Sequence, residues 1–272
     1  MNDIAAFAQD ICGGADIMSK NKDLTLNNSD ETVDENISEA NPGSKIQMEQ
    51  ISKTGAVVVT NGTHTIYCLM IFGTIEGHNF AENSVKTTKY ERVIPQLVAI
   101  EESPSVDGLL ILINTVGGDI EAGLSLAELV AGMKKPTVSM VIGGGHSIGV
   151  PLAVSAKKTF IARSASMMIH PVRTTGTTLG TSQAFEYLKR MQNRITRFIT
   201  DNSKIDSDRF LELVTNTSEL DMDIGTVLEG EEAVTEGIID KVGNLSDALA
   251  SLYDMIDNRK VTRNFNSDHK KK

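Results

Sequence analysis

The chain is poor in the features that would place it outside the cell, in a membrane or on a nucleic acid. It has two cysteines in 272 residues, Cys12 and Cys68, so we expect no disulfide framework and a reducing compartment. It contains no run of about 18 apolar residues, which predicts no stable membrane insertion. Its formal charge of −10 argues against a nucleic-acid-binding surface.

Other absences narrow the chemistry. Neither C-x-x-C nor H-E-x-x-H spacing occurs, so we expect no metal. The G-x-x-x-x-G-K-[ST] loop and a complete G-x-G-x-x-G fingerprint are also missing, so we expect no nucleotide and no other cofactor. The first residues include Asp3 and Asp10 and lack a basic region typical of secretory signals,. Together these features predict a cytoplasmic protein.

The first 50 residues differ in composition from the rest. From Asn21 to Gln50 the chain is rich in Asn, Asp, Glu and Ser and has no aromatic residue. Such a segment cannot bury enough apolar surface to order itself. We therefore expect residues 1–50 to be a disordered acidic extension, residues 51–250 to be the folded domain, and residues 251–272 to be a C-terminal tail.

From Ala56 onward, apolar runs typical of strands alternate with segments typical of helices. The expected strands are 56–59, 65–72, 109–113, 137–142, 159–162 and 167–169, and the expected helices are 91–98, 122–133, a helix from 148, and 182–201. A continuous apolar run such as 109–113 predicts a strand buried on both faces. This order of elements predicts a layered α/β fold with a mostly parallel sheet.

Ser147 is the first candidate functional residue. It ends a glycine run, Gly143–Gly145 and His146, and a helix is expected to follow it. Glycines let the backbone turn sharply and expose the hydroxyl, and the free amides of a following helix face a developing negative charge. An ordinary helix N-cap serine has the same local pattern. The pattern becomes informative only when a base is available to activate the hydroxyl.

His170 is the best candidate for that base. It ends the apolar run that begins at Met167, where the chain leaves a strand and where sites in open α/β sheets lie. A histidine buried in the core would have the same setting. His146 is a poor base, because adjacent side chains at a turn point apart.

The remaining candidates are a glycine pair and an acidic loop. Gly117 and Gly118 lie between a buried strand and a helix, where backbone amides can face an oxyanion. A third catalytic group should orient the histidine, and the loop at 218–225 offers three carboxylates. They are Glu219, Asp221 and Asp223. An acidic loop is usually just solvated, and spacing does not choose among them.

Four ordered motifs resemble the proteolytic subunit of the Clp protease family. They are Ile113–Gly123, similar to I-N-S-P-G-G-x-x-x-A-G; Gly143–Gly149, similar to G-x-A-x-S-x-G; Met168–His170, similar to M-I-H; and Glu232–Asp240, similar to E-A-x-x-x-G-L-I-D. The resemblance runs from about Ala56 to Leu245. It implies the layered α/β fold shared with crotonases, in which a handle helix protrudes from the body.

The resemblance also implies a function and a set of roles. Ser147 would be the nucleophile of a serine endopeptidase, with His170 as base. Gly117 or Gly118, with the Ile148 amide, would form the oxyanion hole. The substrate would be a protein or peptide. The handle helix, Ser182–Asp201, would join subunits into a homo-oligomeric ring, which an unfoldase could feed.

The chain also departs from that pattern. Gly145 and His146 replace small residues before the serine, and Pro171 follows His170 directly where Gln-Pro is usual. The loop that would carry the catalytic acid is longer than in the family. Within it we expect Asp223 to orient His170, with Asp221 as the second choice. These departures resemble the translocation-enhancing branch of the family, which is linked to protein export and to degradation of small spore proteins.

The sequence is also compatible with three other functions. One is a Ser–Lys peptidase of the signal-peptide-peptidase type, with Lys189 as base, although a solvated surface lysine has the same pattern. Another is an enoyl-CoA hydratase, which uses similar oxyanion glycines but needs paired carboxylates. The last is an oligomeric adaptor with a degenerate site, which the longer acidic loop would favour.

Overall fold

The computed structural model of the protein describes residues 55–78, 84–173, 181–218 and 224–269. The acidic extension expected over residues 1–50 lies outside the described residues. The strands are β1 (Ala56–Thr60), β2 (Thr65–Glu76), β3 (Thr87–Lys89), β4 (Gly108–Gly118), β5 (Thr137–Gly145), β6 (Lys158–Ile161), β7 (Ser166–Ile169), β8 (Thr226–Glu229) and β9 (Lys241–Val242). The helices are α3 (Tyr90–Glu102), α4 (Ile120–Ala131), α5 (Gly149–Val154), α6 (Thr181–Asn202), α7 (Ser207–Val214), α8 (Gly230–Thr235) and α9 (Leu245–His269).

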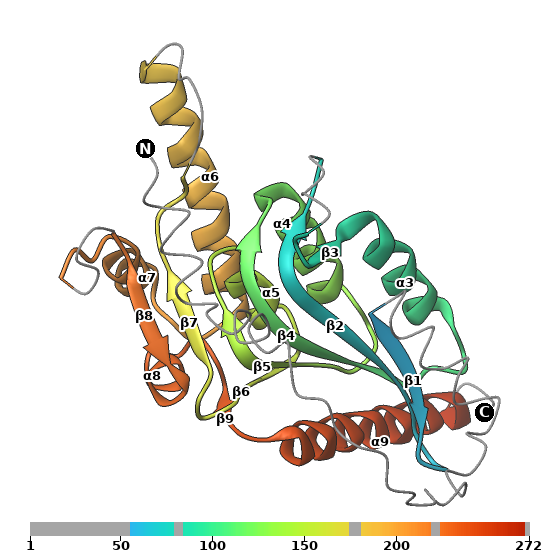
Figure 1. The fold of residues 1–272 in the computed structure, drawn as a ribbon. Helices are drawn as coiled ribbons and strands as arrows, with labels where there is room; N and C mark the ends of the chain where they lie inside the picture. The colour runs from blue at the N-terminus through green and yellow to red at the C-terminus, as the bar shows by residue number, and fades with distance from the viewer. Residues whose placement is uncertain (1–54, 79–83, 174–180, 219–223, 270–272) are drawn as a thin grey trace, which may run out of the picture. The chain divides into compact units, whose positions relative to one another are not determined.

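The described strands join in a mostly parallel sheet, as the alternation of elements predicts (Figure 1). Its main order is β1-β2-β4-β5-β6-β9. The hairpin β1–β2 is antiparallel, and the other pairs along this main order are parallel. Near the end of β5, Gly144 pairs with Ser166 of β7, which in turn pairs antiparallel with β8. This branch brings β7 beside the carboxyl end of β5.

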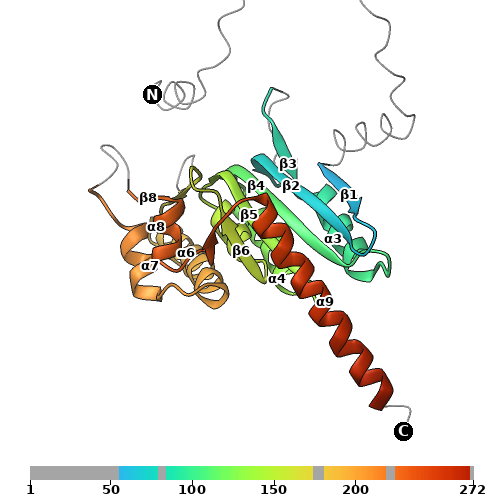
Figure 2. The same cartoon turned by 90° about the horizontal axis from the view of Figure 1, so that it is seen from below.

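Helices cover both faces of the sheet, and alternate residues of β4 show why. Leu109, Ile111 and Ile113 pack into the larger core with α3, α4 and α5. Leu110, which points the other way, packs into a smaller core beneath α9. Successive strand side chains alternate between faces, so a strand that is apolar at every position needs cover on both. Figure 2 shows α9 lying across the sheet on the side away from α4.

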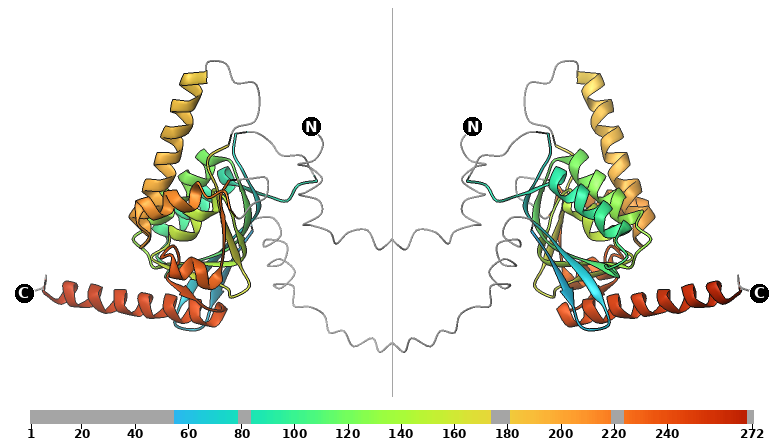
Figure 3. Two further views of the ribbon diagram at one scale, coloured as in Figure 1. Left: turned by 90° about the vertical axis from the view of Figure 1, so that its left-hand side faces the viewer. Right: turned by 90° about the vertical axis from the view of Figure 1, so that its right-hand side faces the viewer.

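The N-terminal end of helix α6 projects from the body, as expected for the handle helix (Figures 1 and 3). Phe185 and Tyr187 in its projecting part are 65% and 54% exposed. Toward its other end, Phe198 and Ile199 are buried in the larger core. One helix face therefore anchors α6, while its first turns extend beyond the sheet.

The prediction of a C-terminal tail from residue 251 is wrong for the residues that the structure describes, because they form a helix. The helix α9 runs continuously from Leu245 to His269. Ala248, Leu252 and Ile256 follow one another at intervals of four and are at most 1% exposed beneath the sheet. This i, i+4 apolar spacing is the signal of an amphipathic helix.

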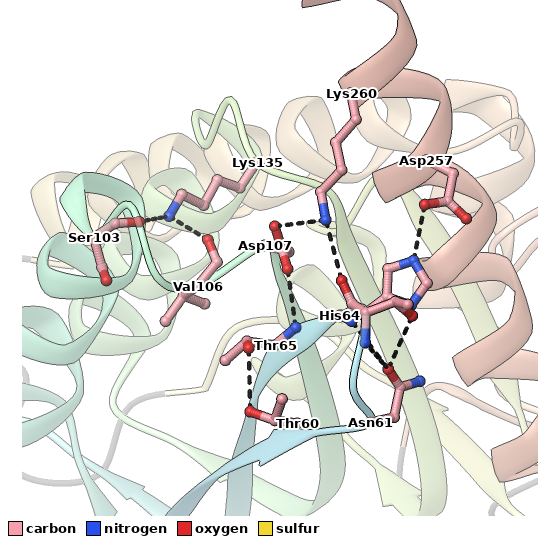
Figure 4. Close-up of polar contacts among 11 residues, drawn as sticks. Thr60, Asn61, His64, Thr65, Ser103, Val106, Asp107, Lys135, Asp257 and Lys260 are labelled. Carbon is pink, nitrogen blue, oxygen red and sulfur yellow. Dashed lines mark hydrogen bonds and ion pairs between the residues drawn. The ribbon is translucent and has the colours of Figure 1, made fainter.

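Polar contacts fasten the same helix to the start of the sheet (Figure 4). His64 Nε2 lies 2.8 Å from Asp257 Oδ1, and its ring stacks on Tyr253 with centroids 4.7 Å apart. Lys260 Nζ lies 3.1 Å from Asp107 Oδ1. Burial raises the pKa of Asp107, but the Thr65 amide and Lys260 outweigh it and hold that pKa below its usual range. These contacts fix α9 against the turn between β1 and β2.

Replacing Leu252 with alanine is expected to lower the free energy of unfolding by about 2–5 kcal/mol, because it leaves a cavity beneath the sheet. Val261 on the same helix is 55% exposed, and Val261→Ala should change stability by less than about 0.5 kcal/mol. Urea unfolding of both variants at one protein concentration provides the measurement. Equal, small losses would contradict the packing of α9 described above.

Candidate active site

Ser147 lies in a tight turn between β5 and α5. Its φ of 56° is the one positive φ at a non-glycine residue in the described chain. Such a conformation costs on the order of 1–3 kcal/mol and persists where neighbouring contacts impose it. Here the Ser147 amide donates to the Met168 carbonyl at 2.8 Å, and the His146 amide donates to the Thr115 carbonyl at 3.1 Å. A strained serine between a strand and a helix is typical of nucleophile turns.

His170 follows the last residue of β7 and lines the same cavity as Ser147. Its Nδ1 lies 2.8 Å from the carbonyl oxygen of Pro171. Because a carbonyl can only accept, Nδ1 carries the proton and the neutral ring has its lone pair on Nε2. The structure therefore brings the two principal candidates together, with Nε2 of His170 as the atom that can take a proton.

His146 is placed differently. Its Nδ1 accepts a hydrogen bond from the Met168 amide at 3.0 Å. Since an amide can only donate, the lone pair of Nδ1 is occupied and Nε2 carries the proton of the neutral ring. Burial, and to a lesser extent the charge of His170, lower the pKa of His146. The ring is thus neutral and engaged with the backbone, which does not suit a general base.

The glycine pair at the end of β4 borders the site, with Gly117 close to Ser147 and Gly118 in the cavity wall. The Gly117 amide donates to Thr115 Oγ1 at 3.0 Å. The Asp119 amide donates to the Ile75 carbonyl of β2 at 2.9 Å. Of the two glycines, Gly118 lines the cavity beside Ser147, so its amide is the candidate donor to an oxyanion there.

A second amide faces the site from the serine turn. Within the described residues, the Ile148 amide makes no hydrogen bond. The helix that follows, α5, has 6 residues, so its macrodipole is small. The amides of Gly118 and Ile148 are thus the candidate donors near Ser147, whereas the Gly117 amide is already bonded to Thr115.

The cavity beside Ser147 has a volume of about 200 Å³ and a mainly apolar wall. Its apolar lining includes Ile120, Ile148, Val150, Ile195, Ile199 and Phe210, and its polar lining includes Ser147, His170, Arg173 and Gln192. A small cavity of this kind suits an apolar side chain held next to the hydroxyl of Ser147.

The carboxylates expected to orient His170, namely Asp223, Asp221 and Glu219, lie outside the described residues. The chain becomes described again at Ile224, and Gly225 has a φ of 141°. A Cβ on Gly225 would lie 2.3 Å from the Ile169 carbonyl oxygen and 2.9 Å from the His170 Cβ. The backbone just after the acidic loop therefore touches the residue that the acid would orient.

Lys189, the base of the Ser–Lys alternative, is exposed on α6. The side chains that α6 contributes to the cavity are Gln192, Ile195 and Ile199. Lys189 does not line the cavity, and this placement argues against a Ser–Lys site.

Three residues that the sequence analysis does not single out connect the parts of the site. Thr115, at 2% exposure, donates from Oγ1 to the Gly73 carbonyl at 2.6 Å and accepts from Gly117. Asn114 Oδ1 accepts from the Gly144 amide at 2.9 Å. Gln192 Oε1 accepts from the Val172 amide at 3.0 Å. Their position beside the glycine turns was the available signal for the first two, while Gln192 had none.

Among the residues that the structure describes, no three His, Cys, Asp or Glu side chains are grouped so as to hold a metal ion. None of the described helices combines the length and the apolar composition needed to cross a bilayer.

The fold and this site define an α/β protein of the Clp type, with a serine and a histidine at the ends of neighbouring strands. Residues 66–246 match the Clp protease family, and the chain belongs to that family. It is 50% identical over 211 residues to the translocation-enhancing protein TepA of Halalkalibacterium halodurans, a match that covers 77% of this chain and 82% of that protein. The resemblance predicted from the four motifs is thereby confirmed.

More distant relatives share the family and the fold. The ATP-dependent Clp protease proteolytic subunit of Leuconostoc citreum is 26% identical over 167 residues, which cover 59% of this chain and 80% of that protein. A solved structure of a ClpP1 variant from Listeria monocytogenes superposes with a TM-score of 0.55 at 21% identity, covering 75% of this chain and 99% of that chain. The predicted Clp-type layered fold is confirmed.

Proposed function

We propose that the protein is a serine endopeptidase that forms an acyl-enzyme on Ser147, with His170 as general base. The observation that carries the proposal is the positive φ of Ser147 in a turn that opens on the same apolar cavity as His170. Membership of the Clp protease family supports the same chemistry.

The reaction follows from the positions of these groups. Nε2 of His170 takes the proton of Ser147 Oγ as that oxygen attacks the substrate carbonyl carbon. The Gly118 and Ile148 amides donate to the resulting oxyanion, while the Gly117 amide stays with Thr115. His170 then returns the proton to the leaving amine. Water, activated by His170, releases the acyl group in the same way.

Asp223 is the residue that we propose to orient His170, with Asp221 as the alternative. Asp223 comes two residues before Gly225 in the sequence, and Gly225 packs against His170. A carboxylate there would support the Nδ1 proton and stabilise the imidazolium that forms during acyl transfer.

The wider setting is also part of the proposal. A homo-oligomeric ring joined through α6 would bury Phe185 and Tyr187, which the described chain leaves exposed. Substrates would be proteins or peptides that reach the cytoplasm, delivered by an unfoldase where they are folded. Neither a cofactor nor a nucleic acid is required.

Similarity to a translocation-enhancing protein favours a link to protein export, and degradation of small spore proteins is the second option within that branch.

Fluorophosphonate labelling followed by intact-mass measurement tests the activated serine. The wild-type protein is expected to gain one adduct, and Ser147→Ala and His170→Ala are expected to gain none, since each lacks one half of the nucleophile–base pair. An assembled, folded wild-type oligomer that gains no adduct would reject the peptidase and favour an adaptor with a degenerate site.

A further inference from the structure

The backbone of Met168 is held on both sides by the serine turn. Its carbonyl oxygen accepts from the Ser147 amide at 2.8 Å, and its amide donates to His146 Nδ1 at 3.0 Å. We refer to these two hydrogen bonds as the Met168 clamp. Because Met168 lies two residues before His170 on the same strand segment, the clamp fastens the base-bearing chain to the nucleophile-bearing turn.

The clamp acts where the sheet itself contributes little. The ladder between β5 and β7 consists of one pair, Gly144 with Ser166. In contrast, β7 pairs with β8 at four positions, from Ser166 to Ile169. The distance between Ser147 and the end of β7 therefore depends strongly on the Met168 clamp.

We propose that His146 is a positioning residue of this site, whose neutral ring keeps His170 in place relative to Ser147. The inference rests on the proposed peptidase function. An apolar side chain at position 146 would offer no acceptor to the Met168 amide. The imidazole supplies that acceptor without taking part in proton transfer to substrate.

The proposal makes the site sensitive to protonation of His146. A proton on Nδ1 removes the acceptor, and the new charge faces His170, which itself becomes positive during acyl transfer. His170, at the end of β7, is the titratable group of the described chain whose charge acts on this ring. The folded state lowers the pKa of His146. The stabilisation that its neutral ring provides is therefore complete above about pH 6.5 and is lost as the pH falls through the folded-state pKa.

A pair of substitutions separates the acceptor from the ring. In His146→Asn, the side-chain oxygen takes approximately the position of Nδ1 and does not titrate. His146→Leu fills a similar volume and offers no acceptor. Hydrogen–deuterium exchange of the full-length protein reports on the Met168 amide, and the fluorophosphonate labelling rate reports on Ser147.

The leucine variant is expected to exchange the Met168 amide faster and to label about tenfold or more slowly, since small displacements of reacting groups are costly. The asparagine variant should stay close to wild type in both measurements at neutral pH. Between about pH 5 and 8, its labelling rate should fall less steeply on acidification than that of the wild type, because one titrating group has been removed.

The outcomes distinguish the two proposals. Wild-type exchange and labelling in the leucine variant would overturn the positioning role of His146, and so would equal pH profiles in the asparagine variant and the wild type. Absence of labelling in the wild type would instead reject the peptidase function. Exchange at Met168 would then still decide whether the clamp exists.

Discussion

Peptide hydrolysis should fall by about 10⁶-fold when Ser147 is replaced by alanine. The expectation follows from the loss of the atom that we propose forms the acyl-enzyme, while the proposed oxyanion donors, the Gly118 and Ile148 amides, remain to give a small residual rate. A fluorogenic peptide with an apolar residue before the scissile bond is the appropriate substrate, because the cavity beside Ser147 is lined mainly by apolar side chains.

Ser155→Ala is the matched control for this substitution. Ser155 is a buried serine that follows α5, and its Oγ donates to the Leu152 carbonyl at 2.8 Å, away from the cavity. Its removal should cost about 1 kcal/mol of stability and leave turnover near the wild-type rate. Turnover by Ser147→Ala within about tenfold of wild type would reject Ser147 as nucleophile.

Much of the fold could be predicted because its strands have a strong local pattern. The apolar run at 109–113 needed cover on both faces, and the structure supplies it from α4 and α9. The helix α9 was not predicted at all, although Leu252 and Ile256 follow the i, i+4 rule. Its polar residues on the exposed face, together with the basic end of the chain, gave it the composition of a solvated tail.

Candidate site residues could be predicted where the signal is local in the sequence, and less so where the contacts join distant segments. Ser147, which follows the glycine run, and His170, which ends an apolar run, can be recognised in the sequence. The choice between Gly117 and Gly118 as a donor is not, because it depends on the Thr115 hydroxyl and on the ladder to Ile75. Position 146 likewise has no signal for its bond to Met168, which depends on the tertiary arrangement of β7.

Alanine at Gly117 is expected to lower the fluorophosphonate labelling rate by about 10²-fold, because it displaces the nucleophile. A Cβ at this position would lie 2.6 Å from Ser147 Cβ and 3.2 Å from its Oγ. It would also lie 3.0 Å from the His146 carbonyl oxygen. Contacts this close force the serine turn to move, and the φ of 96° at Gly117 adds strain of about 1–3 kcal/mol for a residue with a side chain.

Gly132→Ala provides the comparison that separates this local effect from a general loss of stability. Gly132 caps α4 with a φ of −75°, and a Cβ there would come no closer than 3.3 Å to the Glu128 carbonyl oxygen. An ordinary backbone conformation predicts a change in stability of about 1 kcal/mol or less and unchanged labelling. Labelling is compared under conditions where thermal melting shows both variants to be folded. A folded Gly117→Ala variant that labels at the wild-type rate would show that the close approach of β4 does not position Ser147.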